Sequence, residues 1–316
     1  MPQPTATDVH VDAILTNTSV AYIQKADDFI AAKVFPTVPV QKQTDKYFTY
    51  TKNDWFRDEA QKRGPSTESV GSGYGVSTAA YACDVFALHK DVSDQIRANA
   101  DMPLDMDRDA ALFITQRLLL KQEIQWVTDA FATSVWGTDL TPTNLWSDFT
   151  ASDPINDVEV GKRTILSTTG FLPNTFVMGY QVWEKLRNHP DFIDRIKYSG
   201  GRVVTEEIVA QLLGVDRVLV AKAIKATNVE GETAAYSFVH GKHALLAYVQ
   251  PSPSLLMPSA GYTFPWQGVS QGLGQNIGIK RIPNPLKEST RVEGQVAFDN
   301  KIVATDLGYF FSGAVA

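Results

Sequence analysis

The chain has 316 residues, of which 44% are hydrophobic and 20% charged, so it can bury a core and is not a disordered chain. Its formal net charge is −6 and no basic tail is present, which argues against a protein that coats DNA. Cys83 is the only cysteine, so the fold does not depend on an internal disulfide. No signal sequence is visible, and no apolar run reaches the roughly 20 residues that a membrane-spanning helix needs. These features predict a soluble protein made inside a cell.

Residues 1–45 are predicted to form an arm. Residues 22–35 show weak helical periodicity, and Pro36 and Pro39 make the following stretch extended. The pattern contains no second helix that would close a small core. We therefore expect the arm to lie on another part of the assembly, and deletion of residues 1–40 to leave a subunit that folds but assembles poorly.

Residues 46–91 are predicted to form a long projecting hairpin. Residues 46–51 and 75–89 have the aromatic and β-branched composition of strands. The segment between them is charged at first and then rich in Gly and Ser, and a loop of this length in a compact domain tends to be functional or disordered. Aromatic and Arg side chains beside charges of both signs are typical of interface hot spots. We predict an intersubunit contact made by Trp55, Phe56, Arg57, Asp58, Glu59, Lys62 and Arg63.

The clearest element is a long helix that begins near Asp105. Asp105, Asp107 and Asp109 complement the dipole of its first turns. The apolar stripe is read as Phe113, Leu120, Ile124, Val127, Phe131 and Val135, and the helix is expected to end at Gly137. That is about 30 residues, or roughly 45 Å at 1.5 Å per residue.

After residue 150 the pattern predicts mixed helices and strands. Helices are expected at 153–169, 181–188, 191–198 and 206–213, and strands at 175–179, 217–224, 236–240 and 244–250. The chain then becomes rich in Pro and Gly over 251–275. It is expected to end in strands at 277–282, 290–299 and 301–311, with a turn at Asp299 and Asn300.

Motifs that suggest enzyme chemistry lack the structural context that they require. Ser270 lies in a G-x-S-x-G sequence, but no strand precedes it and no helix follows it. His240 and His243 have no Cys or carboxylate near them in sequence, so a turn between two strands explains them better than a metal site. Cys83 is read as a small apolar strand residue. We predict no catalytic residue, no cofactor and no metal.

This order of elements resembles the major capsid proteins of tailed double-stranded DNA bacteriophages. The most specific stretch is residues 174–197, in which a strand and a short helix bearing Trp183 and Leu186 are followed by His189, Pro190 and a second helix. The resemblance implies an α+β fold with an N-terminal arm (1–45) and an extended E-loop (46–91). It also implies a peripheral domain with the spine helix (92–150 and 276–304) and an axial domain (151–275 and 305–316).

The resemblance also implies a function. Pentamers and hexamers of the chain would form an icosahedral capsid that encloses double-stranded DNA without binding it specifically. A separate scaffolding protein and a portal are the expected partners, a decoration protein is left open, and no membrane is involved. The expected location is the virion, after assembly in the host cytoplasm. The alternatives are an encapsulin-like cellular shell and, less favoured, a serine hydrolase that uses Ser270.

Overall fold

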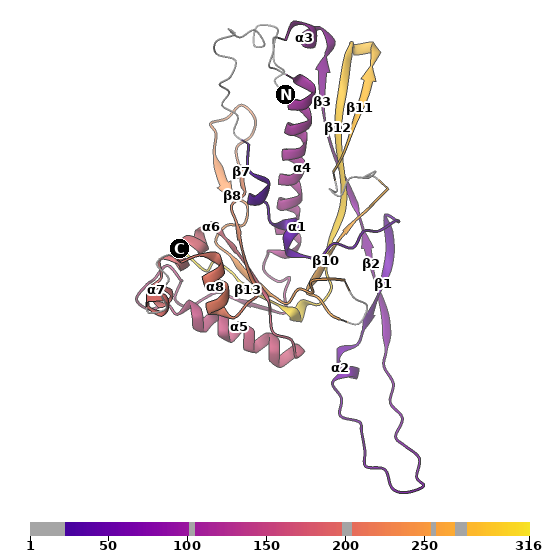
Figure 1. The fold of residues 1–316 in the computed structure, drawn as a ribbon, viewed down its shortest axis with the longest axis vertical. Helices are drawn as coiled ribbons and strands as arrows, with labels where there is room; N and C mark the ends of the chain where they lie inside the picture. The colour runs from indigo at the N-terminus through magenta and orange to yellow at the C-terminus, as the bar shows by residue number, and fades with distance from the viewer. Residues whose placement is uncertain (1–22, 101–104, 198–203, 254–256, 269–276) are drawn as a thin grey trace.

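A long antiparallel sheet forms one part of the molecule (Figure 1). The computed structural model describes residues 23–100, 105–197, 204–253, 257–268 and 277–316. Strand β12 runs through the sheet, with β3 along one edge and β11 and then β10 along the other. The bounds are β3 (Asp84–Ser93), β10 (Gly261–Pro265), β11 (Ile277–Asn284) and β12 (Ser289–Ile302). A short helix, α3 (Asp94–Asn99), follows β3.

Helix α4 (Met106–Ala130) is the predicted spine helix, and it packs along this sheet. It begins as predicted, because the Asp105 carboxylate accepts the backbone N–H groups of the first turn. It ends earlier than predicted, at Ala130 and not at Gly137. The Trp136 indole turns back and donates to the Ala130 carbonyl at 2.7 Å, which satisfies one of the terminal acceptors of the helix.

The predicted apolar stripe of this helix was partly wrong. Phe113 is 42% exposed, whereas its neighbour Ile114 is buried and contacts the sheet. The two elements approach so closely at Gly294 of β12 that an added Cβ would lie 2.4 Å from Cγ2 of Ile114. Only glycine fits there without a shift of the helix or the strand.

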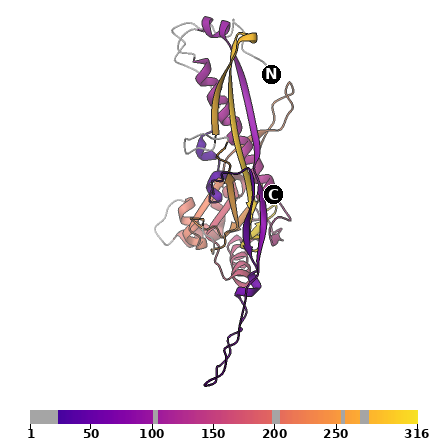
Figure 2. The same cartoon turned by 90° about the vertical axis from the view of Figure 1, so that its right-hand side faces the viewer.

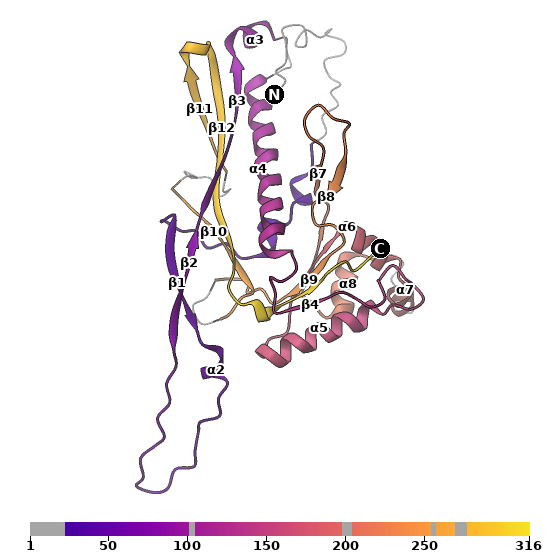
Figure 3. The same cartoon turned by 180° about the vertical axis from the view of Figure 1, so that it is seen from behind.

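The second part is an α/β lobe beside the lower end of α4 (Figure 3). Its sheet has the order β4–β13–β9–β5–β6, with β4 parallel to β13, β5 parallel to β6, and β9 antiparallel to both of its neighbours. The strand bounds are β4 (Thr138–Leu140), β5 (Thr175–Gly179), β6 (Arg217–Ala221), β9 (Ala244–Ala247) and β13 (Gly308–Phe311). The lobe also contains α5 (Pro154–Thr169), α6 (Tyr180–Arg187), α7 (Pro190–Lys197) and α8 (Glu206–Leu213). A small hairpin of β7 (Ile224–Ala226) and β8 (Tyr236–Phe238) extends beside α4.

The predicted terminal strands are partly wrong. Residues Asp299 and Asn300 do not form a turn; β12 runs through them without a break. The Asn300 amide donates to Asp129 of α4, and its carbonyl oxygen accepts from the Thr263 hydroxyl of β10, so tertiary partners hold this residue in an extended strand. The chain turns later, over residues 303–307, before β13.

The projecting hairpin is formed by β1 (Thr44–Tyr50) and β2 (Val76–Ala82), which pair in register from Thr44 with Ala82 to Tyr50 with Val76. The short helix α2 (Lys52–Trp55) follows β1, and the chain from 56 to 75 then extends away from the body (Figures 1 and 2). The predicted strand at 75–89 is two strands. It divides at Cys83, and its second half is β3 of the long sheet.

Part of the predicted arm belongs to the core of the subunit. Helix α1 (Ala31–Val34) and the residues around it are buried against α4 and the lobe: Phe29, Ile30, Ala31, Val34 and Phe35. Residues Thr37 and Val40 form bridges to Thr263 and Trp266. The prediction that this stretch has little core contact in its own subunit is therefore wrong for residues 29–35. The effect of deleting residues 1–40 stays a prediction. Among the described residues, none of the helices combines the length and the apolar character needed to cross a membrane.

Candidate intersubunit contact surface

The base of the projecting hairpin is fixed to the body by backbone and side-chain contacts. Cys83 N–H donates to the Gln43 carbonyl, and the Gln43 amide donates back to the Cys83 carbonyl. The Ala82 N–H donates to the Asp299 carboxylate of β12. Lys52 of α2 forms an ion pair with Asp306, next to β13. The hairpin therefore leaves the body in a defined direction.

Beyond this base the chain has little contact with its own subunit. Every residue from 60 to 75 is exposed, and none of them lies in a helix or strand. The Asp54 carboxylate accepts the Gly75 N–H at 2.9 Å, which closes the loop where it leaves the hairpin. A loop that buries so little apolar surface cannot offset the entropy cost of ordering its chain.

The predicted aromatic anchors lie near the base of this loop and not at its tip. Trp55 is 58% exposed and packs between Tyr50 and Tyr74, with ring centroids 6.3 and 5.6 Å apart respectively. Phe56 is 63% exposed, and its ring edge faces Gly170 at the end of α5. Sequence reasoning placed both residues on a loop without partners. The structure instead places Trp55 in an aromatic cluster of three rings that is still open on one side.

The predicted charged residues follow these aromatics along the loop. Arg57 lies 3.6 Å from carboxylate oxygens of both Asp54 and Glu59, and Arg63 donates to the backbone carbonyl of Thr67. Within the described chain, Asp58 and Lys62 form no ion pair. Exposed pairs of this kind contribute only about 0–1 kcal/mol each, so they leave the charges available to another chain.

The serine hydrolase alternative gains no support from the described residues. Ser270 lies outside them. Ser152, His189 and Asp191 do come together, with 3.0 Å between Ser152 Oγ and His189 Nε2, but the proton directions are those of a structural contact. His189 Nδ1 accepts the Asp191 N–H, so Nε2 carries the proton and donates to Ser152, whose hydroxyl donates to the Asp148 carbonyl. Both side chains are buried, and burial lowers the pKa of His189. With the proton on Nε2, the ring faces Ser152 as a donor, which is the reverse of the arrangement in a catalytic triad.

The other reactive residues also have structural roles. Burial raises the pKa of the Cys83 thiol to about 11, so it stays protonated and unreactive. Among the described residues, no three His, Cys, Asp or Glu side chains are placed to hold a metal ion. His240 and His243 lie in the turn between β8 and β9, as predicted, but sequence reasoning missed the Glu123 carboxylate of α4, 3.5 Å from His240.

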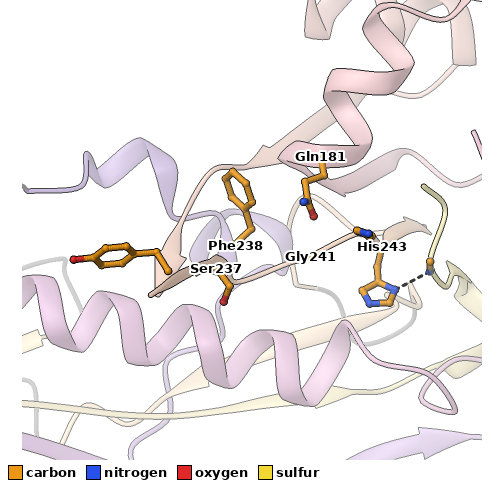
Figure 4. Close-up of a pocket in the computed structure, with 8 residues that line it drawn as sticks. Gln181, Ser237, Phe238, Gly241 and His243 are labelled. Carbon is orange, nitrogen blue, oxygen red and sulfur yellow. Dashed lines mark hydrogen bonds between the residues drawn. The ribbon is translucent and has the colours of Figure 1, made fainter. Parts of the chain in front are cut away.

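An open pocket of about 580 Å³ lies beside this turn (Figure 4). Its lining is Gln181, Tyr236, Ser237, Phe238, Gly241, Lys242, His243 and Gly313. His243 Nδ1 accepts the backbone N–H of Gly313, and its ring stacks on Phe310. The lining offers no carboxylate or thiol to work with this histidine, so the pocket does not have the groups of a hydrolytic site.

The known proteins that this chain resembles are capsid proteins and a phage-related protein. No family model matches the chain. It is 26% identical over 325 residues to the major capsid protein of Burkholderia phage BcepMu, covering 96% of both chains, and 24% identical over 314 residues to that of Pseudomonas phage JBD67, covering 97% of both. A phage-related protein from Bordetella bronchiseptica superposes with a TM-score of 0.67 at 22% identity over 92% of this chain and 94% of the other.

Two further structures define the fold. The mature capsid protein of bacteriophage PhiM1 gives a TM-score of 0.62 at 10% identity, over 96% of this chain and 92% of the other. The fold is that of the tailed-phage major capsid proteins. An encapsulin from Synechococcus elongatus shares it at a TM-score of 0.55 and 11% identity, over 97% of this chain and 96% of the other. The α+β class and the resemblance to capsid proteins predicted from the sequence are thereby confirmed.

Proposed function

We propose that this chain is the subunit of a viral shell, which assembles as pentamers and hexamers into an icosahedral capsid around double-stranded DNA. The observation that carries the proposal is the loop at 56–75, which projects from the body with no core of its own. Its exposed aromatics and charges gain partners when copies pack together. The capsid proteins similar over nearly the whole chain support the same function. The role is structural, and no catalytic step is assigned to it.

The contact residues on the loop divide into two kinds. Trp55 and Phe56 offer apolar surface at the base, where a neighbouring chain can close the open side of the aromatic cluster. Arg57, Asp58, Glu59, Lys62 and Arg63 offer charges of both signs further out. The apolar contacts supply affinity and the charges supply register, since like charges placed opposite each other oppose the wrong alignment.

Assembly of the purified chain tests the proposal directly. Electron microscopy and light scattering, with and without co-expressed scaffolding protein, are expected to show pentamers, hexamers or closed shells. A protein that stays monomeric at every concentration under both conditions would contradict the proposal.

Charge reversal tests the loop itself. Arg57→Glu and Arg63→Glu are expected to leave the melting temperature of the subunit unchanged while they lower the yield of closed shells several-fold, because they place like charges across the contact. Arg57→Lys and Arg63→Lys keep the charge and serve as matched controls. If both reversal variants form shells in the same yield as the unaltered chain, the loop does not have the proposed docking role.

The expected partners remain proposals. They are a separate scaffolding protein, a portal and, if present, a decoration protein, with assembly in the host cytoplasm and the mature protein in the virion. The alternative is an encapsulin-like compartment, favoured only by the shared fold. Shells purified from the natural source distinguish the two, since a viral capsid encloses DNA and an encapsulin-like shell encloses a cargo protein.

A further inference from the structure

A buried carboxylate holds the start of helix α1. Glu123 lies on α4 with no exposed surface, and Oε2 accepts the N–H groups of Ile30 and Ala31 at 3.0 and 2.8 Å. The Ile30 N–H is shared with Oε1, at 3.1 Å. At the other end of the same segment, the Arg217 guanidinium donates to the carbonyls of Lys33 and Val34, both at 2.9 Å. The segment 30–35 is therefore held at both ends by charged groups from α4 and β6.

The other oxygen of Glu123 faces a histidine. His240 Nε2 lies 3.5 Å from Oε1 of Glu123, and His240 is also fully buried. Its ring packs between Trp126 and Phe131, with centroid distances of 5.5 and 5.0 Å. Neither ring nitrogen of His240 has a hydrogen-bond partner among the described residues. A proton on Oε1 would give Nε2 the donor that it lacks.

None of the other titratable groups described near the pair donates a proton to His240 Nε2. The charge of Lys33 on α1 lowers the pKa of Glu123, and Lys33 forms its own ion pair with Asp27. The His243 ring packs edge-on against Phe131, and burial lowers the pKa of His243, which favours its neutral form. The Arg217 charge is directed to the carbonyls at the other end of the segment.

Burial shifts the pKa values of Glu123 and His240 in opposite directions. It raises the pKa of Glu123 from 4.5 to about 7 and lowers the pKa of His240 from 6.5 to about 3. Both shifts favour the neutral forms, so a single proton on the native pair belongs on the carboxyl group. In the unfolded chain the same pair also holds one proton between pH 4.5 and 6.5, but on the imidazole.

We propose that Glu123 and His240 form a proton-exchange pair, in which the proton moves from the imidazole to the carboxyl group when the chain folds. The imidazolium loses its Nε2–H bond, the carboxylate gains an O–H bond, and two charges become two neutral groups. A neutral pair costs far less to bury than an ion pair does. Folding then involves no net proton uptake or release by this pair in mildly acidic solution, so the contribution of the pair to stability does not change with pH there.

The stability of the two single variants is predicted to depend on pH in opposite directions. With Glu123→Gln only His240 remains, and its lowered native pKa means that the unfolded chain binds the extra proton. The unfolding equilibrium constant, divided by that of the unaltered chain, should rise about tenfold for each unit that the pH falls from 6.5 to 4.5. With His240→Phe only Glu123 remains, and the ratio should rise about tenfold for each unit that the pH rises over the same range.

The experiment is urea unfolding of the full chain, followed by circular dichroism between pH 4.5 and 6.5. Ratios for both variants that do not change with pH, or that change in the same direction, would overturn the proposal. Because a variant in the core can fail to fold, infrared spectroscopy of the native protein at pH 6 provides a second measurement. A protonated-carboxyl band present in the unaltered chain and weaker in Glu123→Gln supports the pair, and identical spectra overturn it. Neither measurement requires shell assembly.

Discussion

Removal of residues 23–40 is expected to unfold the subunit, and the size of the effect follows from burial. Phe29, Ile30, Val34 and Phe35 are each at most 6% exposed. Complete burial of one such side chain contributes about 1.5–3 kcal/mol, so the four together contribute roughly 6–12 kcal/mol. Entire domains are stable by only about 5–15 kcal/mol. The loss also leaves the Glu123 carboxylate without the two backbone N–H groups that it now accepts.

The assay compares two truncated chains by thermal unfolding. One lacks residues 1–22 and the other lacks residues 1–40, so the difference between them belongs to residues 23–40 alone. We expect the longer deletion to abolish the cooperative transition that the shorter deletion retains. In the full chain, Phe35→Ala alone should cost about 3–5 kcal/mol. Equal transition midpoints for the two truncated chains would refute the assignment of this segment to the core.

Three further predictions concern single residues. Gly294→Ala should lower the free energy of unfolding by about 1–3 kcal/mol because its Cβ would overlap Ile114, whereas Gly73→Ala, in open space, should leave it unchanged when both are measured by urea unfolding. Arg217→Met should cost about 1–3 kcal/mol in the same assay, since the exposed Lys33 carbonyl and the partly buried Val34 carbonyl both lose a charged donor. Cys83 should resist alkylation at pH 8 in the native protein and react at once in urea; rapid reaction without urea would contradict its burial.

The bounds of a helix or strand could be predicted from the sequence where capping residues or short apolar runs mark its ends. Helix α5 begins after Asp153, whose carboxylate accepts the Asn156 N–H, and ends at Gly170, whose φ of 75° suits glycine. Helix α8 and strand β5 were predicted with their observed bounds. These elements depend on caps and short apolar runs, which a sequence displays directly.

The wrong predictions arise where a contact from outside the element determines where that element ends or what it buries. Helix α4 stops at Ala130 because Trp136 folds back over it, and no local signal marks that stop. Strand β12 continues through Asn300 because Thr263 and Asp129 satisfy its side chain. Glu123 stands beside Gln122 in a polar stretch that resembles a solvated helix face, so its burial could not be predicted without the chain that covers it.

The predicted contact residues lie in the projecting hairpin, but Trp55 and Phe56 lie near its base. Seven residues were identified because aromatic and charged side chains are unusual together in a long loop. Their sequence gave no sign that Trp55 would rest against Tyr50 and Tyr74, because this contact depends on the register of β1 with β2. Whether the seven contact a neighbouring subunit stays a prediction.

The route of the chain from the projecting hairpin into the body determines how the subunit bears mechanical load. Strand β2 passes through Cys83 directly into β3, which pairs with β12 from Asp84 with Phe298 to Ser93 with Ser289. Tension on the loop therefore pulls β3 along its own axis. In an antiparallel ladder the hydrogen bonds lie across that axis, so they are loaded in shear and share the force instead of opening one after another. In a shell whose neighbouring subunits hold this loop, tension on the loop would load the β3–β12 ladder of each subunit in shear.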